Sequence, residues 1–117
     1  MKFTGSMKMN YEFRRLYNKG KSAASPYLVV YIRKTNRSTN SLGITVSTKV
    51  GKAVVRNRVR RRLREIYRLN EEHIVRGTQM VIVARNRAVG ATYQQLQEAF
   101  LRTCRKLDVF QERSEER

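Results

Sequence analysis

The 117-residue sequence lacks acidic residues over almost half of its length. Residues 13–64 contain no Asp or Glu but 15 Lys or Arg, and the formal net charge of the chain is +17. Four of the nine acids lie in residues 108–117. Because self-repulsion of this order disfavours a compact state unless a polyanion or counterions screen it, the composition favours a nucleic acid or an anionic membrane as the partner.

Other absences narrow the class of protein. The single cysteine, Cys104, excludes an internal disulfide and a cysteine-based zinc site. No apolar run approaches the roughly 20 residues that span a membrane, and the start, MKFTGSMKMN, has no apolar signal core. We therefore expect a soluble, cytoplasmic protein without a membrane partner. Its length predicts one domain over residues 1–117, with residues 1–9 and 108–117 as mobile ends.

The sequence is also poor in groups for catalysis. Acid–base chemistry usually needs a carboxylate or a histidine, and the candidates are few: Glu12, Glu65, Glu71, Glu72, His73 and Glu98. No pair of aspartates is present to hold two metal ions, and no convincing Ser-His-Asp or Cys-His set is found. The acids at 71 and 72, with His73, are expected to be solvated charges at a helix end. We predict no catalytic residue and no metal site, and expect the polypeptide to bind RNA rather than cut it.

The densest positive charge lies in Lys49–Arg68, KVGKAVVRNRVRRRLREIYR, which has an apolar period of three and four residues. This spacing predicts a helix over about 53–73. Its apolar arc contains Val55, Val59, Leu63, Ile66 and Leu69, and its opposite arc contains Asn57, Arg60, Arg61, Arg64 and Arg68. Arg62 lies close to the apolar arc, so its stem is expected along the core edge. Parallel like charges destabilise a helix, which indicates that a polyanion covers this face.

The flanking segments predict a small α+β domain. A helix over 10–20 is expected to be capped by Asn10 and to end at Gly20. Strands are predicted over 27–34, 42–47 and 78–85, and a last helix begins after the capping box of Thr92 and Gln95. The resulting order is α-β-β-α-β-α. It predicts a small α/β sandwich with a split β-α-β crossover and with the helices on one face of the sheet.

Aromatic residues form a second candidate binding surface. Phe13 and Tyr17 lie one turn apart on the first helix, and alternation puts Tyr27 and Tyr31 on one side of the first strand. These rings are either core residues or the wall of a groove with stacking platforms for unpaired bases. Small residues on the second strand, such as Gly43 and Thr45, would leave room for a ligand beside Tyr31.

The turn before the basic helix lacks the spacing of a nucleotide-binding loop.

The motifs together resemble the protein component of bacterial ribonuclease P. The resemblance covers roughly residues 8–107 and rests on the order and spacing of the following pieces: Phe13 and Tyr17 before Gly20, the strand with Tyr31, LGITVS, Lys49-Val50-Gly51, the series from Arg56-Asn57-Arg58 to Arg64-Glu65, and VIVAR. It implies an α/β sandwich with a left-handed crossover, which is rare. Thr48 and Arg62 depart from the residues common in that family.

The resemblance implies an RNA-binding subunit that assists a large catalytic RNA in removing the 5′ leader of precursor tRNA, one protein per RNA. It implies Mg²⁺ with the RNA and no cofactor on the protein alone. The implied RNA-binding residues are Lys49, Lys52, Arg56, Asn57, Arg58, Arg60, Arg61, Arg64 and Arg68, and the implied leader cleft holds Phe13, Arg14, Tyr17 and Tyr31. The alternatives are a ribosomal-type protein on structured RNA, a DNA-binding factor and a protein-only nuclease.

Overall fold

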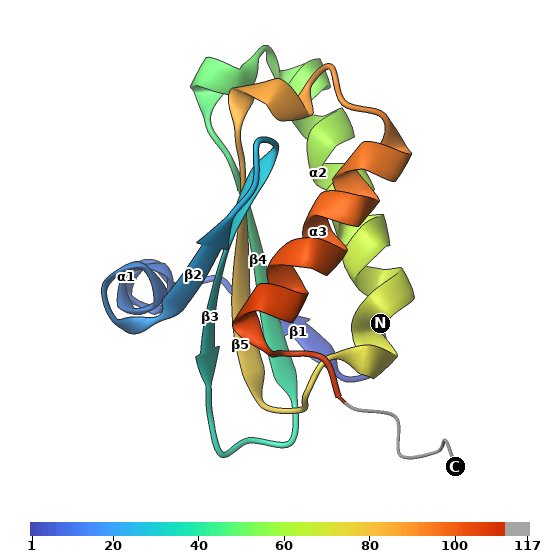
Figure 1. The fold of residues 1–117 in the computed structure, drawn as a ribbon. Helices are drawn as coiled ribbons and strands as arrows, with labels where there is room; N and C mark the ends of the chain where they lie inside the picture. Colours follow the sequence, from blue (N-terminus) through green and yellow to red (C-terminus); the bar gives the residue numbers. More distant parts are fainter. Residues whose placement is uncertain (112–117) are drawn as a thin grey trace.

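The computed structural model describes residues 1–111, which form a five-stranded sheet between helices (Figure 1). The strands are β1 (Thr4–Ser6), β2 (Lys21–Ala24), β3 (Leu28–Lys34), β4 (Asn40–Val46) and β5 (Thr78–Ala84). The helices are α1 (Asn10–Lys19), α2 (Ala53–Asn70) and α3 (Tyr93–Leu107). The α+β class is confirmed, with β1 and β2 as two strands that the sequence pattern did not predict.

The strand order across the sheet is β1-β4-β5-β3-β2. The β4 and β5 strands pair in parallel and are joined through α2, whereas β3 is antiparallel to both β5 and β2. The predicted β-α-β crossover is therefore present. It is not split, because β4 and β5 are direct neighbours in the hydrogen-bonded sheet. The left hand of the crossover stays a prediction.

The helices cover both faces of the sheet, and the prediction of a single covered face was wrong. Figure 1 shows α2 and α3 on one face and α1 on the other. Alternation along the strands explains this arrangement: Met80 and Ile82 point into the core below α2 and α3, whereas Val81 packs with Leu16 of α1. Because β5 is central and buried on both faces, it is apolar on both sides.

The main core lies between the sheet and the α2–α3 layer. The predicted inward residues of β3, which are Leu28, Val30 and Ile32, are buried there. On α2 the buried set is Val59, Leu63, Ile66 and Tyr67, while Leu69 is 52% exposed. The predicted apolar arc of this helix was therefore wrong at Leu69. Tyr67 replaces Leu69 because its ring packs edge-on to Phe100 of α3, with the ring centroids 6.5 Å apart.

Parts of both predicted mobile ends are packed. Strand β1 pairs in parallel with β4, and Phe3 accepts a backbone hydrogen bond from Asn40. At the other end Val109 is fully buried and accepts a hydrogen bond from the backbone of Val75. Backbone hydrogen bonds therefore hold the N-terminal segment, and hydrogen bonding with apolar burial holds the segment around Val109. The remaining part of the predicted C-terminal end, residues 112–117, lies outside the described residues.

Candidate nucleic-acid interface

Helix α2 carries a cationic outer surface opposite its buried face. Asn57, Arg58, Arg61, Arg64 and Arg68 are exposed, as are Lys49 and Lys52 just before the helix. Four of the helix residues line an open hollow of about 340 Å³, namely Asn57, Arg60, Arg61 and Arg64. This hollow therefore has three guanidinium groups and no carboxylate, and Arg is suited to bidentate contacts with phosphate.

Several arginines of α2 are held by the protein itself. Arg56 donates through Nε to the Gly51 carbonyl at 3.1 Å, and Arg60 donates to Oδ1 of Asn57 at 3.0 Å. Arg62 is half-buried and donates to the Ala91 carbonyl at 3.2 Å, so its guanidinium ties α2 to the turn before α3. The predicted position at the core edge is confirmed for Arg62. Within residues 1–111, Arg58, Arg61 and Arg64 have no such partner, and their exposed guanidinium groups are available to a ligand.

The predicted cleft aromatics come together on the α1 face of the sheet. Tyr17 and Tyr31 lie edge-on with their ring centroids 4.9 Å apart, and the Tyr17 hydroxyl is 3.3 Å from Oγ1 of Thr45. Tyr17 is 40% exposed and Tyr31 is half-buried. Phe13 is half-buried against the small core of Met7, Leu16 and Val81. Phe13 is therefore partly a core residue, while Tyr17 presents a ring to solvent.

The room expected beside Gly43 is filled by Phe13. A Cβ added to Gly43 would lie 2.6 Å from Cε1 of the Phe13 ring, closer than side chains approach one another. The small residue thus seats an aromatic of the protein rather than a ligand. Arg14, also predicted for the cleft, is exposed on α1.

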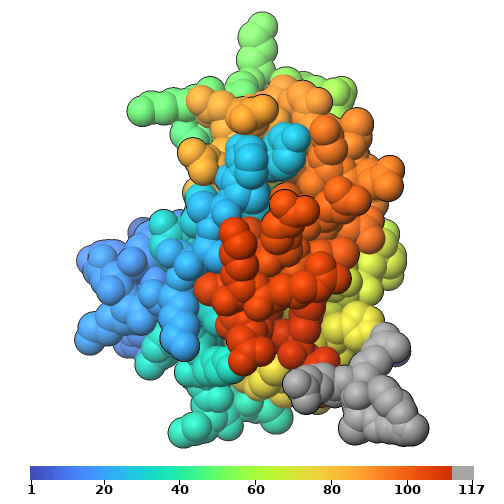
Figure 2. All heavy atoms as spheres, viewed as in Figure 1, coloured from blue at the N-terminus to red at the C-terminus, as the bar shows by residue number. Residues whose placement is uncertain are grey.

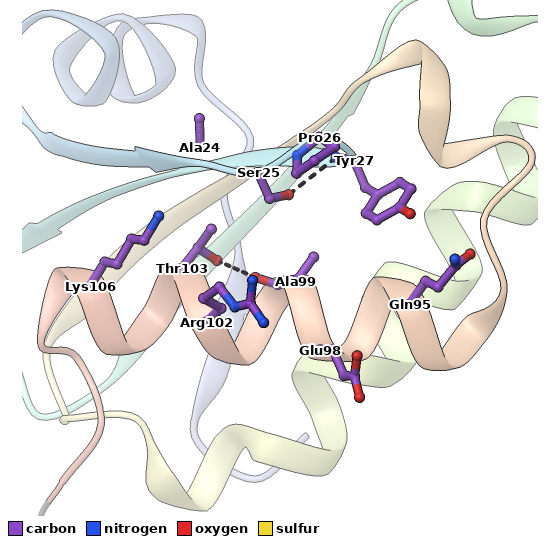
Figure 3. A pocket seen from close by; sticks show the side chains of 10 residues that line it. All are labelled: Ala24, Ser25, Pro26, Tyr27, Gln95, Glu98, Ala99, Arg102, Thr103 and Lys106. Carbon is purple, nitrogen blue, oxygen red and sulfur yellow. Dashed lines mark hydrogen bonds between the residues drawn. The ribbon is translucent and has the colours of Figure 1, made fainter.

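Tyr27 is not part of the aromatic cluster. It precedes β3, so the alternation that placed it beside Tyr31 does not extend to it. Its ring packs against the core on the α3 side, with the Arg87 guanidinium 5.9 Å from its centroid. Figure 3 shows the Tyr27 ring facing α3, the helix that carries Gln95.

Glu71 differs most from its prediction as a solvated charge. It is only 3% exposed, and its carboxylate accepts hydrogen bonds from the backbone N–H groups of Lys2 and Phe3 and from the Thr4 hydroxyl. Burial raises the pKa of Glu71, but these three donors outweigh it and hold the pKa below its usual value. The sequence held one weak sign of this role, which is an acid directly after an amphipathic helix. It gave no sign of the partner, because Thr4 lies 67 residues before Glu71.

Three other groups, Glu65, Tyr67 and Cys104, also have pKa values that the structure shifts. Glu65 accepts two hydrogen bonds from Arg68, at 2.6 and 3.0 Å, which lower the pKa of its carboxyl. Burial raises the pKa of the Tyr67 hydroxyl and raises that of the Cys104 thiol to about 12. Cys104 is therefore buried and unreactive, as expected. Among residues 1–111 no three His, Cys, Asp or Glu side chains gather where they could hold a metal ion.

The described helices contain no segment long and apolar enough to cross a membrane. What the site offers instead is a cationic helix surface and a separate group of aromatic rings. Taken with the mixed sheet, these features define a small α+β protein whose surface suits a polyanion with unpaired bases.

Comparison with known proteins identifies the family. The family model described as Ribonuclease P matches residues 1–108. The chain is 41% identical to the ribonuclease P protein component of Alkaliphilus oremlandii, over 93% of this chain and 96% of that protein. It also resembles the solved RNase P protein of Staphylococcus aureus, with 34% identity and a TM-score of 0.83 over 91% of this chain and 97% of that one. The solved RNase P protein of Thermotoga maritima is 31% identical, with a TM-score of 0.75 over 83% of this chain and 92% of that one. The chain belongs to the ribonuclease P protein family.

Proposed function

We propose that this chain is the protein subunit of a ribonuclease P and assists an RNA subunit in removing the 5′ leader from precursor tRNA. Membership of the family carries this proposal. It is supported by the exposed guanidinium surface of α2, because neutralising phosphates releases counterions and drives binding to RNA. Family membership also favours it over a ribosomal-type role without cleavage.

We further propose that the catalytic centre and its Mg²⁺ belong to the RNA subunit, with one protein bound per RNA in the cytoplasm. The acids of the described residues support this assignment. Glu71 accepts hydrogen bonds from the N-terminal segment, and Glu65 is paired with Arg68. Since no described group of three His, Cys, Asp or Glu fits a metal ion, the polypeptide is assigned the tasks of binding and positioning.

The two surfaces have different tasks in this proposal. The α2 surface and the preceding Lys49 and Lys52 contact the RNA subunit. The aromatic cluster of Phe13, Tyr17 and Tyr31, together with the exposed Arg14 of α1, binds the single-stranded leader. Exposure of the Tyr17 ring supports the second assignment, because base stacking on an aromatic tolerates any leader sequence.

The experiment is a cleavage assay on precursor tRNA with Mg²⁺. Purified protein alone should leave the substrate intact, and addition of the cognate RNA subunit should produce the mature 5′ end. At physiological salt the protein should increase the rate over that of the RNA alone. Cleavage by RNA-free protein would place the catalytic centre in the polypeptide and overturn the proposal.

A further inference from the structure

A second cationic surface lies at the β2 edge of the sheet, away from α2. Strand β2 is the outermost strand, and β3 extends beyond it, because Lys21 pairs with Ile32 while Arg33 and Lys34 continue. A hollow of about 260 Å³ opens at this point. Its lining consists of Lys19, Lys21, Ile32, Arg33, Lys34 and Leu107. Four of these six residues are cations, and none is an acid.

A larger hollow continues along the seam between β2 and α3. It has a volume of about 320 Å³ and is lined on the α3 side by Arg102 and Lys106, among others. Figure 3 shows Lys106 reaching from α3 towards the strands. Lys106 lines this hollow and the next residue, Leu107, lines the smaller one, so the two are adjacent. Figure 2 shows β2 in blue beside the orange-red α3 along this seam. We name the β2-edge surface by its cations, which are Lys19, Lys21, Arg33, Lys34, Arg102 and Lys106.

The protein does not neutralise this charge within the part that the structure describes. The ion pairs there join Lys2 to Glu72 and Arg68 to Glu65, and neither involves the β2-edge surface. Glu98 is the one acid in the lining of the two hollows. Six cations with one nearby carboxylate repel each other, and a polyanion would relieve that repulsion.

The β2-edge surface is separate from the surface of α2. Helix α2 packs on β4, whereas α3 packs on β3 and β2. In the sheet, β4 and β2 are three strand spacings apart, or about 14 Å at roughly 4.8 Å per strand. No residue lines both the α2 hollow and either hollow at the β2 edge. The two cationic surfaces therefore have separate linings on different helices.

Protection of a sheet edge explains only part of this charge. Lysines on an edge strand discourage pairing with other chains, which accounts for Lys21. It does not account for Arg102 and Lys106, which lie on a helix, or for Arg33, which is half-buried with its guanidinium 3.5 Å from Oε1 of Gln79. Edge protection therefore does not explain why cations from four different elements gather at this point.

We propose that the β2-edge surface binds the phosphate backbone of a second RNA segment, distinct from the segment on α2. The inference rests on the proposed function, which supplies RNA as the polyanion. Two rings lie near β2: Tyr31, the cross-strand partner of Ser22, contacts Tyr17 of α1, and Tyr27, which lines the larger hollow, is packed against the core. The surface therefore recognises backbone charge, and the protein holds two RNA segments towards opposite edges of one sheet.

The first test compares two variants of equal charge. Lys21→Gln with Lys106→Gln removes two cations from the β2-edge surface. The control, Lys2→Gln with Lys8→Gln, removes two exposed lysines elsewhere. Binding to the cognate RNA subunit is measured over a salt series, with melting temperatures to confirm folding. The first variant should reduce the salt slope by roughly 1.4 to 1.8, the value for two phosphate contacts, and the control should leave it unchanged. Equal reductions in both would mean a general charge effect and overturn the proposal.

The second test locates the RNA directly. Cys104 is buried with a thiol pKa of about 12, so an introduced surface cysteine is the reactive one. A radical-generating iron chelate is attached at Ser22→Cys on β2 or at Ala53→Cys at the start of α2, both exposed positions. The two tethers should cut different segments of the RNA subunit or of bound precursor tRNA. Cutting from position 53 alone would remove the second site and leave the proposed function standing, whereas cutting from neither position would remove both.

Discussion

The two faces of the sheet are built for different tasks. The face under α2 and α3 is closed by a large core with fully buried aromatics such as Tyr67 and Phe100. The face under α1 has a core of three buried residues, and its rings at 13, 17 and 31 keep part of their surface in contact with solvent. Since burial of apolar area is the main source of stability, the first face supplies most of the free energy of folding. The second face can therefore keep aromatic surface available for a ligand.

The largest expected effect tests this division with a pair of phenylalanines. Phe100→Ala should reduce the free energy of unfolding by about 3 to 5 kcal/mol, the usual cost of a cavity at a buried Phe. Phe13→Ala should cost clearly less, because Phe13 is only half-buried. Urea denaturation of both variants measures the two values. Equal costs would mean that the α1 face is as much a core as the other.

Glu71 gives the next largest effect, at the end of the closed face. Glu71→Gln should cost about 1 to 3 kcal/mol of stability at neutral pH, because hydrogen bonds to a buried charged acceptor are lost or weakened. The folded-state pKa of Glu71 is lowered. Its carboxylate thus stabilises the fold above the ordinary pKa of about 4.5, and this contribution is lost as pH falls through the lowered value. Unfolding curves between neutral and acid pH should show wild type and variant converging at low pH. Glu72→Gln, at an exposed position, is the control and should show no such pH-dependent gap.

The open face is tested by a pair of tyrosines on α1. Tyr17→Ala should weaken binding of precursor tRNA to the protein–RNA complex by about 1 to 3 kcal/mol, the value of one stacked base, and should spare mature tRNA. Tyr11→Ala removes a ring that is also exposed, at 58%, but does not join Tyr31. It should weaken neither. Equal losses for precursor and mature tRNA in Tyr17→Ala would remove the leader from this face.

The smallest change per residue is expected on α2. Arg61→Ala and Arg64→Ala should each lower the salt slope of binding to the RNA subunit by roughly 0.7 to 0.9, with melting temperatures close to wild type because both side chains are exposed. Arg37→Ala, in the turn between β3 and β4, is the matched control and should leave the slope in place. If the slope is the same in all variants, the RNA contacts do not include these arginines.

The spacing of apolar residues predicted those features of the fold that are determined within a single helix or strand. The inward residues of β3, the start of α2 and the capping box of Thr92 and Gln95 follow from local rules, and all are present. The predicted end of this helix near residue 73 was wrong, because α2 ends at Asn70 and residues 71–73 form a separate 3-10 turn. The short outer strands escaped prediction because β1 is Thr-Gly-Ser, with Thr4 as its one β-branched residue, and β2 is Lys-Ser-Ala-Ala, with none. Pairing with β4 and β3 holds them in place, and that information lies elsewhere in the chain.

The same limit applies to the sites. The pattern on α2 identified which residues face outward, because a helix carries its own period. It could not show that Gly43 seats Phe13 or that Glu71 binds the N-terminal segment, since both contacts join residues far apart in sequence. Nor could it assemble the β2-edge surface, whose cations come from α1, β2, β3 and α3.

The link between Glu71 and the N-terminal strand has a consequence for how the chain is made. Thr4 leaves the ribosome 67 residues ahead of Glu71, its partner, which is a delay of roughly 3 to 13 s at about 5 to 20 residues per second. The N-terminal strand can pair with β4, whose Asn40 follows Thr4 by 36 residues, but its hydrogen bonds to Glu71 can form only after α2 has been synthesised. An apolar strand left open for that time would invite association with other chains. The small polar sequence Thr-Gly-Ser exposes almost no apolar surface, so it has little tendency to associate with other chains before α2 has emerged.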